Sequence, residues 1–414
     1  MKGVFKGLHL TCLPILWPFT PMELSKRIRG LTGGGSDGWG NFYRARQMVA
    51  RGEDVIELTI GEHDRQTEPE ILDAMHRAAL AGATGYAAIP GITTLRAAIA
   101  ERVAERTGVA TKTENVIVTP GAQAGLFAAH HAVCDEGDTA VFIDPYYTTY
   151  PGTIRTVGAR PVAVEAQADA GFQPRQSDLE AVAPGARSLL INTPNNPTGA
   201  VYSNRTLQGI CEVCRTHDLW LISDEVYDTQ LWSGSHQSPR ALPGMADRTL
   251  VVGSLSKSHA MTGSRLGWVV GPEDAVQHMS TLALGTTYGV PGYIQEAGLF
   301  ALAQGSDLED RISAPFRRRH KVAQDILAAS NVIAVVPSTA TMYLMLDIRA
   351  TGLSGEDFAS KLLEEERIAV MPGESFGLAA AGHLRVALTT EDDRMTYALN
   401  RLMALAERLA SQAA

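Results

Sequence analysis

Short runs of apolar, often β-branched residues alternate with amphipathic stretches from about Val55 to about residue 290. This alternation predicts an α/β fold in which helices flank a largely parallel sheet. Helical periodicity between the runs, from Ala122 to Cys134 and from Asn204 to His217, predicts crossover connections. The candidate strands are VIELTI, NVIVTP, TAVFID, ARPVAVEA, SLLINTP, LWLISD, TLVVGSL and LGWVVG.

The pattern changes after VPGYIQEAGLFALAQ, where long amphipathic stretches predict long helices. Three further apolar runs, TMYLMLDI, RIAVMPG and HLRVALTT, predict strands among them, so a smaller α+β domain is expected. We predict a flexible N-terminal extension over residues 1–21 and an N-terminal segment of the small domain over 22–54. The large domain is predicted over 55–295 and the rest of the small domain over 296–414.

Charge and composition narrow the class of partner. The 414 residues are 45% hydrophobic and 20% charged, with a net charge of −9. No excess of Lys and Arg is present to neutralise phosphates, which argues against nucleic acid and anionic membranes and favours a small-molecule partner.

The first residues resemble a secretory signal, with two lysines before a short apolar run. Pro14 and Pro18 interrupt that run, no small-residue cleavage site follows, and the run is too short to span a membrane. We therefore predict a cytoplasmic protein, with Met22 as a possible natural start.

Two motifs are interpreted as structural. Cys211 and Cys214 form a CxxC pair inside a predicted helix, without the second ligand pair that zinc needs, so no metal site is expected. Gly33, Gly35 and Gly38 match the GxGxxG dinucleotide fingerprint, but the preceding SKRIRGLT is basic and polar rather than a strand. A loop is predicted there.

The segment SLSKSHAMTGSRLGW follows a predicted strand and combines Ser254, Ser256, Lys257 and Arg265. Ligands of open α/β sheets bind at strand ends. An amine can form an imine with an aldehyde, and hydroxyls with a guanidinium can hold a phosphate. This segment resembles the lysine segment of the fold type I aminotransferases, the aspartate aminotransferase family. These enzymes use pyridoxal 5′-phosphate (PLP), and the resemblance implies that Lys257 carries the cofactor as a Schiff base.

Further parts of such a site follow predicted strands in the family's order. Gly121, Ala122 and Gln123 open a helix, where backbone N–H groups and the helix dipole favour a phosphate. By the family pattern, Tyr147 in DPYYTTYP stacks on the pyridine ring. Asn196 in NNPTG is expected to donate to the cofactor's phenolic oxygen and to lie beside the substrate.

Asp224 is the last residue of the predicted strand LWLISD, and Tyr227 follows three residues later. The resemblance makes Asp224 the partner of the pyridine nitrogen, supported by Tyr150, and Tyr227 a donor to the phenolic oxygen. Arg385 lies in the apolar run HLRVALTT, where a charge is costly unless it is paired. Either an internal salt bridge or a bidentate grip on the substrate carboxylate would pair it.

The resemblance covers the chain from about Met22 and implies a large domain with a seven-stranded, mostly parallel sheet plus a smaller α+β domain. It places Gly61 in the substrate pocket and implies that Tyr86 reaches the cofactor phosphate of a neighbouring subunit. The protein is thus expected to be a homodimer with shared active sites. The bond between Asn196 and Pro197 is expected to be cis.

The predicted reaction is a ping-pong transfer of an amino group from an L-amino acid to a 2-oxo acid, with Lys257 as general base and acid. The motifs equally allow a PLP-dependent carbon–sulfur β-lyase of the same fold. A PLP-binding regulatory module is the third reading, but such modules carry a basic helix-turn-helix domain, which this acidic chain does not show.

The donor is less constrained, because it depends on pocket shape. HDLWLISDEVY, SPRALPGMADRT, SLSKSHAMTG and DIRATGLSGEDFA are most similar to arginine–pyruvate aminotransferases within the family. The chain departs from the usual pattern at His63, Arg65 and Ser264, where Pro, Phe and Trp are common. Arg65 is predicted to bind substrate, and in the pocket it would repel a guanidinium. If it faces outward, that objection disappears.

Overall fold

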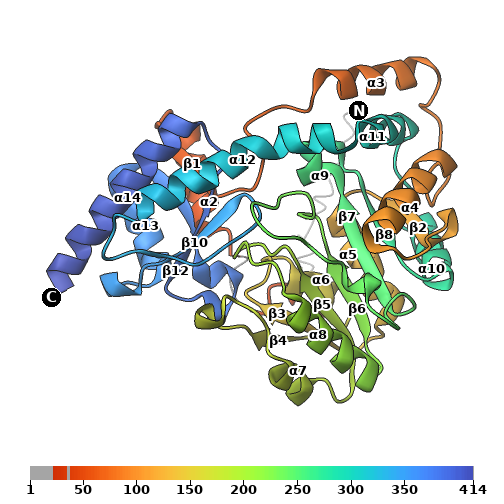
Figure 1. Cartoon of the computed structure of the whole chain (residues 1–414), viewed down its shortest axis with the longest axis horizontal. Helices are drawn as coiled ribbons and strands as arrows, with labels where there is room; N and C mark the ends of the chain where they lie inside the picture. The colour runs from red at the N-terminus through yellow and green to blue at the C-terminus, as the bar shows by residue number, and fades with distance from the viewer. Residues whose placement is uncertain (1–21, 35–37, 414) are drawn as a thin grey trace, which may run out of the picture.

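The structure is a computed structural model that describes residues 22–34 and 38–413, so the predicted extension over residues 1–21 lies outside the described residues. Two sheets with their helices make up the chain, and α12 (Gly305–Leu327) runs between them (Figure 1). The larger sheet carries most of the predicted site residues.

The larger sheet has seven strands in the order β2-β8-β7-β6-β5-β3-β4. Every pairing is parallel except those made by β8, which confirms the prediction of a mostly parallel sheet. The strands are β2 (Val116–Thr119), β3 (Thr139–Asp144), β4 (Arg160–Glu165), β5 (Ala186–Asn192), β6 (Trp220–Asp224), β7 (Thr249–Ser254) and β8 (Gly267–Val270).

Helices cover both faces of this sheet. Leu189 and Ile191 of β5 pack toward α7 and α8, whereas Leu190 between them packs toward α5, α6 and α10. Successive strand residues point to opposite faces, so a strand covered on both sides is apolar throughout. The helices are α4 (Thr93–Thr107), α5 (Ala122–Val133), α6 (Tyr150–Thr156), α7 (Gln176–Val182), α8 (Asn204–Thr216), α10 (Glu273–Leu284) and α11 (Gly292–Ala303).

The smaller sheet has the order β1-β11-β12-β10-β9. Helices α2, α13 and α14 pack around it on the left of Figure 1. Its strands are β1 (Ile56–Leu58), β9 (Ala334–Val335), β10 (Tyr343–Asp347), β11 (Ile368–Pro372) and β12 (His383–Ala387), and its helices are α2 (Gly40–Ala50), α13 (Gly355–Glu366) and α14 (Asp392–Ala413). The three longer C-terminal strands confirm the predicted runs, whereas β9 is too short to leave a pattern.

One predicted strand lies in the other sheet. The run VIELTI predicts a strand of the large sheet, but Ile56–Leu58 pairs in parallel with β11 of the smaller sheet. Ile56 and Leu58 enter the core that α12 and α14 cover. Periodicity predicts a strand but not its partner, which is why the sequence alone misplaced it. The domain boundaries as a whole stay a prediction.

The glycine motif and the CxxC pair, both interpreted as structural, lie after a short helix and inside a buried helix, respectively. Gly33 and Gly38 follow the short helix α1 (Lys26–Arg29), and no strand precedes them in the described segment; Gly35 lies outside the described residues. Cys211 and Cys214 are buried in α8 as free thiols, and burial raises their pKa to about 11 and about 12. Reactive thiols have lowered pKa values, so this pair is suited to packing.

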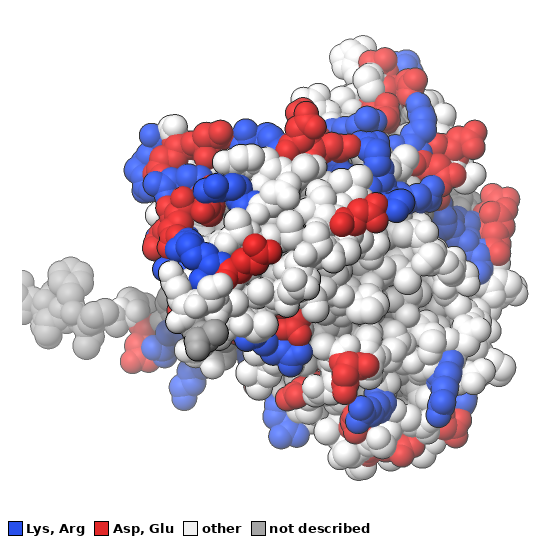
Figure 2. Space-filling view, turned by 60° about the vertical axis from the view of Figure 1, so that its left-hand side comes forward, with Lys and Arg blue, Asp and Glu red and all other residues white. Residues whose placement is uncertain are grey.

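On the face of the molecule shown in Figure 2, basic and acidic side chains are interleaved. Basic and acidic side chains also pair across the helices of the smaller sheet, such as Arg44 with Glu364 and Arg401 with Glu366. Exposed pairs of this kind contribute roughly 0–1 kcal/mol each. No helix in the described part of the chain has the length and apolarity to cross a membrane.

Candidate active site

A cavity of about 330 Å³ opens where β5, β6 and β7 of the large sheet end and β10 and β12 of the smaller sheet approach. Most of the predicted site residues line it: Gly61, Ala122, Gln123, Tyr147, Asn196, Asp224, Tyr227, Ser254, Ser256, Lys257, Arg265 and Arg385. Carboxyl ends of neighbouring parallel strands meet at one edge of a sheet, and this brings together segments far apart in the chain.

Lys257 lies on α9 (Leu255–Ser258), directly after β7. Its Nζ donates a hydrogen bond to the carbonyl oxygen of Gly61. Burial lowers the pKa of the Lys257 amine, and the positive charges of Arg385 and Arg265 act in the same direction. A lowered pKa leaves more of the amine neutral and nucleophilic.

Asp224 is the last residue of β6 and is buried. Its Oδ2 accepts a hydrogen bond from the hydroxyl of Tyr150 at 2.7 Å, and its Oδ1 accepts one from the N–H of Val226 at 3.3 Å. Burial raises the pKa of Asp224 to about 6, against these hydrogen bonds. No basic side chain pairs with it in the described part of the chain, so this carboxylate is available to a cationic group of a ligand.

Asn192 fixes this end of the sheet. Its amide donates to the carbonyl oxygen of Asp224 at 2.9 Å, and its side-chain oxygen accepts from the N–H of Asn196 at 2.7 Å. The Asn196–Pro197 bond is cis, as predicted. Asn192 was not among the predicted residues. An Asn a few positions before NNPTG is typical of a turn, so the sequence gives it no separate signal.

The hydroxyls of Tyr227 and Tyr343 form a hydrogen bond of 2.9 Å on the side of the cavity that faces the smaller sheet. Burial, together with Tyr343, holds the pKa of Tyr227 well above its usual value, so its hydroxyl stays protonated and can donate. A Cβ at Gly61 would overlap the hydroxyl of Tyr343, which explains the glycine there. Tyr343 was not among the predicted site residues, because an aromatic residue in the apolar run TMYLMLDI is typical of a core position.

The opposite end of the cavity is built for an anion. Helix α5 begins at Ala122 without a side-chain cap, after Gly121 with a φ of 80°. Its first N–H groups lack acceptors within the helix. Arg265 lies directly against Gly121, where a Cβ would collide with the guanidinium. Ser254, whose Oγ is 2.9 Å from that of Ser256, adds hydroxyls. The side-chain amide of Gln123 donates to Thr153 of α6 at 2.6 Å and accepts from Thr149, the N-cap residue of that helix, at 2.9 Å.

Arg385 on β12 is only 1% exposed. Its guanidinium lies between the rings of Tyr343 and Phe376, 4.4 Å from each centroid. It donates to Asn196 Oδ1 at 2.9 Å and to the carbonyl oxygen of Thr59, while its Nε has no hydrogen-bond partner. No carboxylate pairs with it among residues 22–34 and 38–413, which argues against an internal salt bridge. A buried, unpaired guanidinium is suited to grip a carboxylate.

The comparisons with known proteins agree with this geometry. The family model for aminotransferase class I and II matches residues 53–402. The chain is 39% identical over 393 residues to an arginine–pyruvate transaminase of Pseudomonas aeruginosa, covering 95% of this chain and 100% of that protein. The chain belongs to the class I and II aminotransferases. An aspartate/prephenate aminotransferase of Thermus thermophilus is 34% identical over 363 residues, 86% of this aminotransferase and 92% of that one.

Solved aminotransferases have the same fold. The aspartate aminotransferase of Thermus thermophilus with maleate superposes with a TM-score of 0.87 at 32% identity, covering 93% of this chain and 100% of that one. The aromatic aminotransferase of Pyrococcus horikoshii has a TM-score of 0.83 at 30% identity, with 88% and 99% covered. The predictions of fold type I and of a PLP-dependent aminotransferase are confirmed.

The residues of this aminotransferase fit PLP. The cofactor is an aldehyde with a basic ring nitrogen and a phosphate, and the cavity offers an amine, a buried carboxylate and an uncapped helix with hydroxyls and a guanidinium. The carboxylate of Asp224 and the Nε of Arg385 lack charged partners in the described chain, and such groups are costly to bury without a ligand. No set of His, Cys, Asp and Glu side chains in that part of the chain could hold a metal ion.

Three predicted residues lie outside the cavity. Gly121 lies directly behind Arg265. Tyr86 is 91% exposed and packs on Tyr288 with ring centroids 5.0 Å apart. Arg65 is exposed, whereas its neighbour His63 packs against the ring of Phe316. The exposed side chain of Arg65 does not line the cavity, and its role in substrate binding stays a prediction.

Proposed function

We propose that this aminotransferase moves the amino group of an L-amino acid to a 2-oxo acid by a ping-pong mechanism, with Lys257 as the residue that holds PLP. The observation that carries the proposal is the meeting of three groups in one cavity. These are the amine of Lys257, the buried carboxylate of Asp224 and the guanidinium of Arg385. A cofactor aldehyde, its ring nitrogen and a substrate carboxylate need these three groups.

The remaining residues would hold the cofactor in place. Asp224, which accepts a hydrogen bond from Tyr150, would pair with the ring nitrogen, Tyr147 would stack on the ring, and Asn196 and Tyr227 would donate to its phenolic oxygen. Gly121, Ala122, Gln123, Ser254, Ser256 and Arg265 would hold the phosphate. When bound, PLP supplies an electron-poor ring that stabilises negative charge on the substrate α-carbon.

The protein's own groups then position the substrate and move one proton. Arg385 and Asn196 orient the α-carboxylate, which points the α-carbon toward Lys257. The Nζ of Lys257 takes the α-proton as general base and returns a proton as general acid. Its lowered pKa, caused mainly by burial, favours the neutral amine that a general base needs.

The proposal includes a cytoplasmic homodimer in which Tyr86 of each subunit reaches the cofactor phosphate of the other. The exposure of Tyr86 and Tyr288, two large aromatic side chains in contact, supports an intersubunit role. A hybrid dimer tests it. Mixing Lys257→Ala and Tyr86→Phe chains should restore one complete site if Tyr86 acts across the interface, and none if it acts within its own chain.

Arginine and pyruvate are the proposed donor and acceptor. The similarity to the arginine–pyruvate transaminase and the outward position of Arg65 both support this choice. The test is a donor panel on the PLP-loaded protein with arginine, aspartate, alanine, methionine and aromatic amino acids, following cofactor absorbance. Loss of the aldehyde absorbance with any of these donors supports transamination, and the largest response is expected with arginine.

The same panel separates the proposed reaction from carbon–sulfur β-elimination. An aminotransferase leaves the cofactor in its amine form after a single turnover without acceptor, and pyruvate restores the aldehyde. A lyase keeps the aldehyde form and releases ammonia. Ammonia release without conversion of the cofactor would contradict the proposed function.

A further inference from the structure

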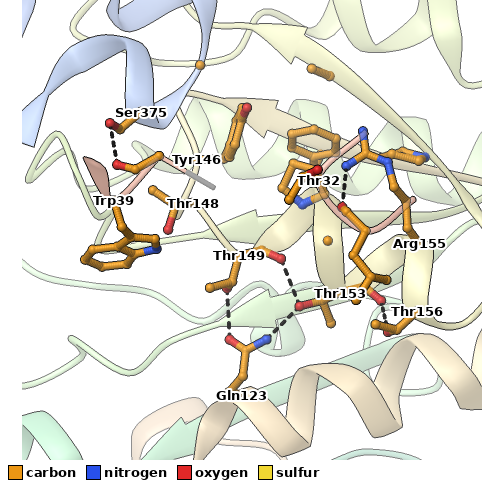
Figure 3. A pocket seen from close by; sticks show the side chains of 18 of the residues that line it. Thr32, Trp39, Gln123, Tyr146, Thr148, Thr149, Thr153, Arg155, Thr156 and Ser375 are labelled. Carbon is orange, nitrogen blue, oxygen red and sulfur yellow. Dashed lines mark hydrogen bonds between the residues drawn. The ribbon is translucent and has the colours of Figure 1, made fainter. Parts of the chain in front are cut away.

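A groove of about 1260 Å³ adjoins the active-site cavity, and the two sheets meet along it. Asp144, the last residue of β3, lines the groove from the larger sheet. Gly377 and Leu378 line it from the connection between β11 and β12 of the smaller sheet. Figure 3 shows their neighbours Tyr146 and Ser375, which line the same groove. A contact at this place ties one sheet to the other beside the site.

The carboxylate of Asp144 caps a short 3-10 turn of the other sheet. This turn, η7, spans Leu378–Ala380, and its N-cap residue Gly377 has no side chain that could accept the first N–H. The Oδ2 of Asp144 accepts the N–H of Leu378 instead, at 2.8 Å. A Cβ at Gly377 would overlap the carboxylate, so only glycine allows this approach. The cap of the turn therefore comes from β3 rather than from the turn itself.

Asp144 has no charged partner that would explain its burial. It is 2% exposed, and no basic side chain pairs with it in the part of the chain that the structure describes. Burial raises the pKa of its carboxyl to about 6, against the N–H groups of Ala379 and Leu378. A buried charge without a cationic partner costs stability unless hydrogen bonds compensate it. The carboxylate and the turn therefore hold each other in place.

The residue before this turn reaches the substrate-binding arginine. Phe376 accepts a second hydrogen bond from the larger sheet, because its carbonyl oxygen is 2.9 Å from the backbone nitrogen of Tyr146. Its ring is fully buried, and the ring centroid lies 4.4 Å from the guanidinium carbon of Arg385. The ring of Tyr343 covers the guanidinium at the same distance. The end of β3 thus fixes Phe376, and Phe376 limits where the guanidinium can lie.

We propose that Asp144 is a positioning residue for substrate binding: it caps the turn beside Phe376 and thereby keeps the guanidinium of Arg385 oriented toward the substrate α-carboxylate. The inference rests on the proposed function, in which Arg385 binds that carboxylate. Asp144 does not line the cavity, so it touches neither cofactor nor substrate. Its loss should weaken the binding of every donor that has an α-carboxylate and leave the surroundings of the cofactor unchanged.

The test removes the N–H that Asp144 accepts while leaving the core intact. Leu378 is suited to it, because its side chain is 79% exposed. Proline lacks the N–H and is tolerated at the first position of a helical turn. In Leu378→Pro, KM for arginine and for every other active donor should rise about fivefold, as expected for a lost cap, while kcat changes less than about twofold. Leu378→Ala keeps the N–H and is the matched control, with unchanged KM values.

Argininamide separates positioning from general damage, because it has no α-carboxylate for Arg385 to bind. Its reaction with the PLP-loaded protein, followed by cofactor absorbance, should have the same rate in the wild type, in Leu378→Pro and in Leu378→Ala. PLP affinity and the absorbance of the bound cofactor should also be equal in the three proteins. A turn that serves only the stability of the fold would not discriminate between arginine and its amide.

Variants on the other side of the contact give a second test. Asp144→Ala should raise KM as Leu378→Pro does, whereas Asp144→Asn keeps an accepting oxygen and should raise it less than about twofold. Phe376→Leu removes the ring through which the effect passes. In that background Leu378→Pro should raise KM by less than about twofold more, since two changes along one chain of contacts are not additive.

The inference is overturned if Leu378→Pro leaves KM unchanged, if Leu378→Ala raises it equally, or if argininamide loses rate by the same factor as arginine. Should Leu378→Pro fail to fold, equal KM values in Asp144→Ala and Asp144→Asn overturn it. A wild type that transaminates no donor, or an Arg385→Leu variant with an unchanged KM, would instead overturn the proposed function.

Discussion

The wall of the cavity that carries Asp224 and Lys257 belongs to the seven-stranded sheet, whereas the wall that carries Arg385 and Tyr343 belongs to the five-stranded sheet. On the first wall, polar groups end neighbouring strands and contact one another within the sheet, as Asn192 does with Asp224, and Lys257 also donates to Gly61 after β1. On the second wall, contacts such as Arg385 to Asn196 cross from one sheet to the other. The position of Asp224 is therefore set mainly within one sheet, whereas the position of Arg385 depends on how the two sheets are placed.

Under this comparison a change on the first wall should abolish chemistry with every donor, while a change on the second should act mainly through substrate binding.

Replacing Lys257 with alanine removes the amine that holds the cofactor and moves the proton. We expect kcat to fall by at least about 10⁴-fold with every donor, because covalent and general-base contributions are lost together. Stopped-flow absorbance with arginine and alanine measures the loss. Lys361→Ala is the control, since this lysine pairs with Glu365 on the surface of α13. Residual activity above a hundredth of the wild type would mean that another amine serves the site.

Replacing Asp224 with asparagine keeps the shape of the first wall and removes its charge. We expect kcat to fall roughly a thousandfold, because the ring loses the anion that keeps its nitrogen protonated. Burial raises the pKa of Asp224 to about 6, with Glu225 acting in the same direction and Tyr150 against it. The carboxylate therefore takes up a proton as the pH falls through about 6, and PLP binding by the wild type should weaken there.

Titrating the apo-protein with PLP between pH 5 and 8 checks this sign. The cofactor phosphate also titrates in this range, so the comparison is with Asp224→Asn, whose PLP affinity should depend less on pH than that of the wild type. Equal pH dependence in the two proteins would show that Asp224 does not contribute.

Replacing Arg385 with leucine tests the second wall. We expect kcat/KM to fall about a hundredfold for all donors, mainly through KM, because the α-carboxylate loses a bidentate partner. PLP affinity and the absorbance of the bound cofactor should change little. Arg385→Lys restores the charge without the fork and should recover only part of the loss. A matching loss of PLP affinity would mean that the two walls are not separable.

The contrast between the walls also explains what the sequence could predict. Lys257, Asp224 and Asn196 follow recognisable strands in contiguous motifs, and strand ends of a parallel sheet converge by geometry. Tyr343 carries no such signal, because an aromatic residue within an apolar run is typical of a core position. The misplaced strand Ile56–Leu58 has the same cause, since three residues of alternating pattern fit either sheet.

Replacing Arg65 is expected to change kcat/KM least. It tests whether a residue that the sequence predicts in the pocket reaches the substrate. Arg65 lies four positions after Gly61, which predicts a place in the pocket, yet its side chain is exposed and lies outside the cavity. An exposed charge acts through water, where about 10 Å of separation screens it at ordinary salt. We therefore expect Arg65→Gln to change kcat/KM for arginine and for aspartate by less than about twofold. Measuring both donors at low and high salt checks this, because a guanidinium that reached the substrate would affect the two donors in opposite directions, and more strongly at low salt.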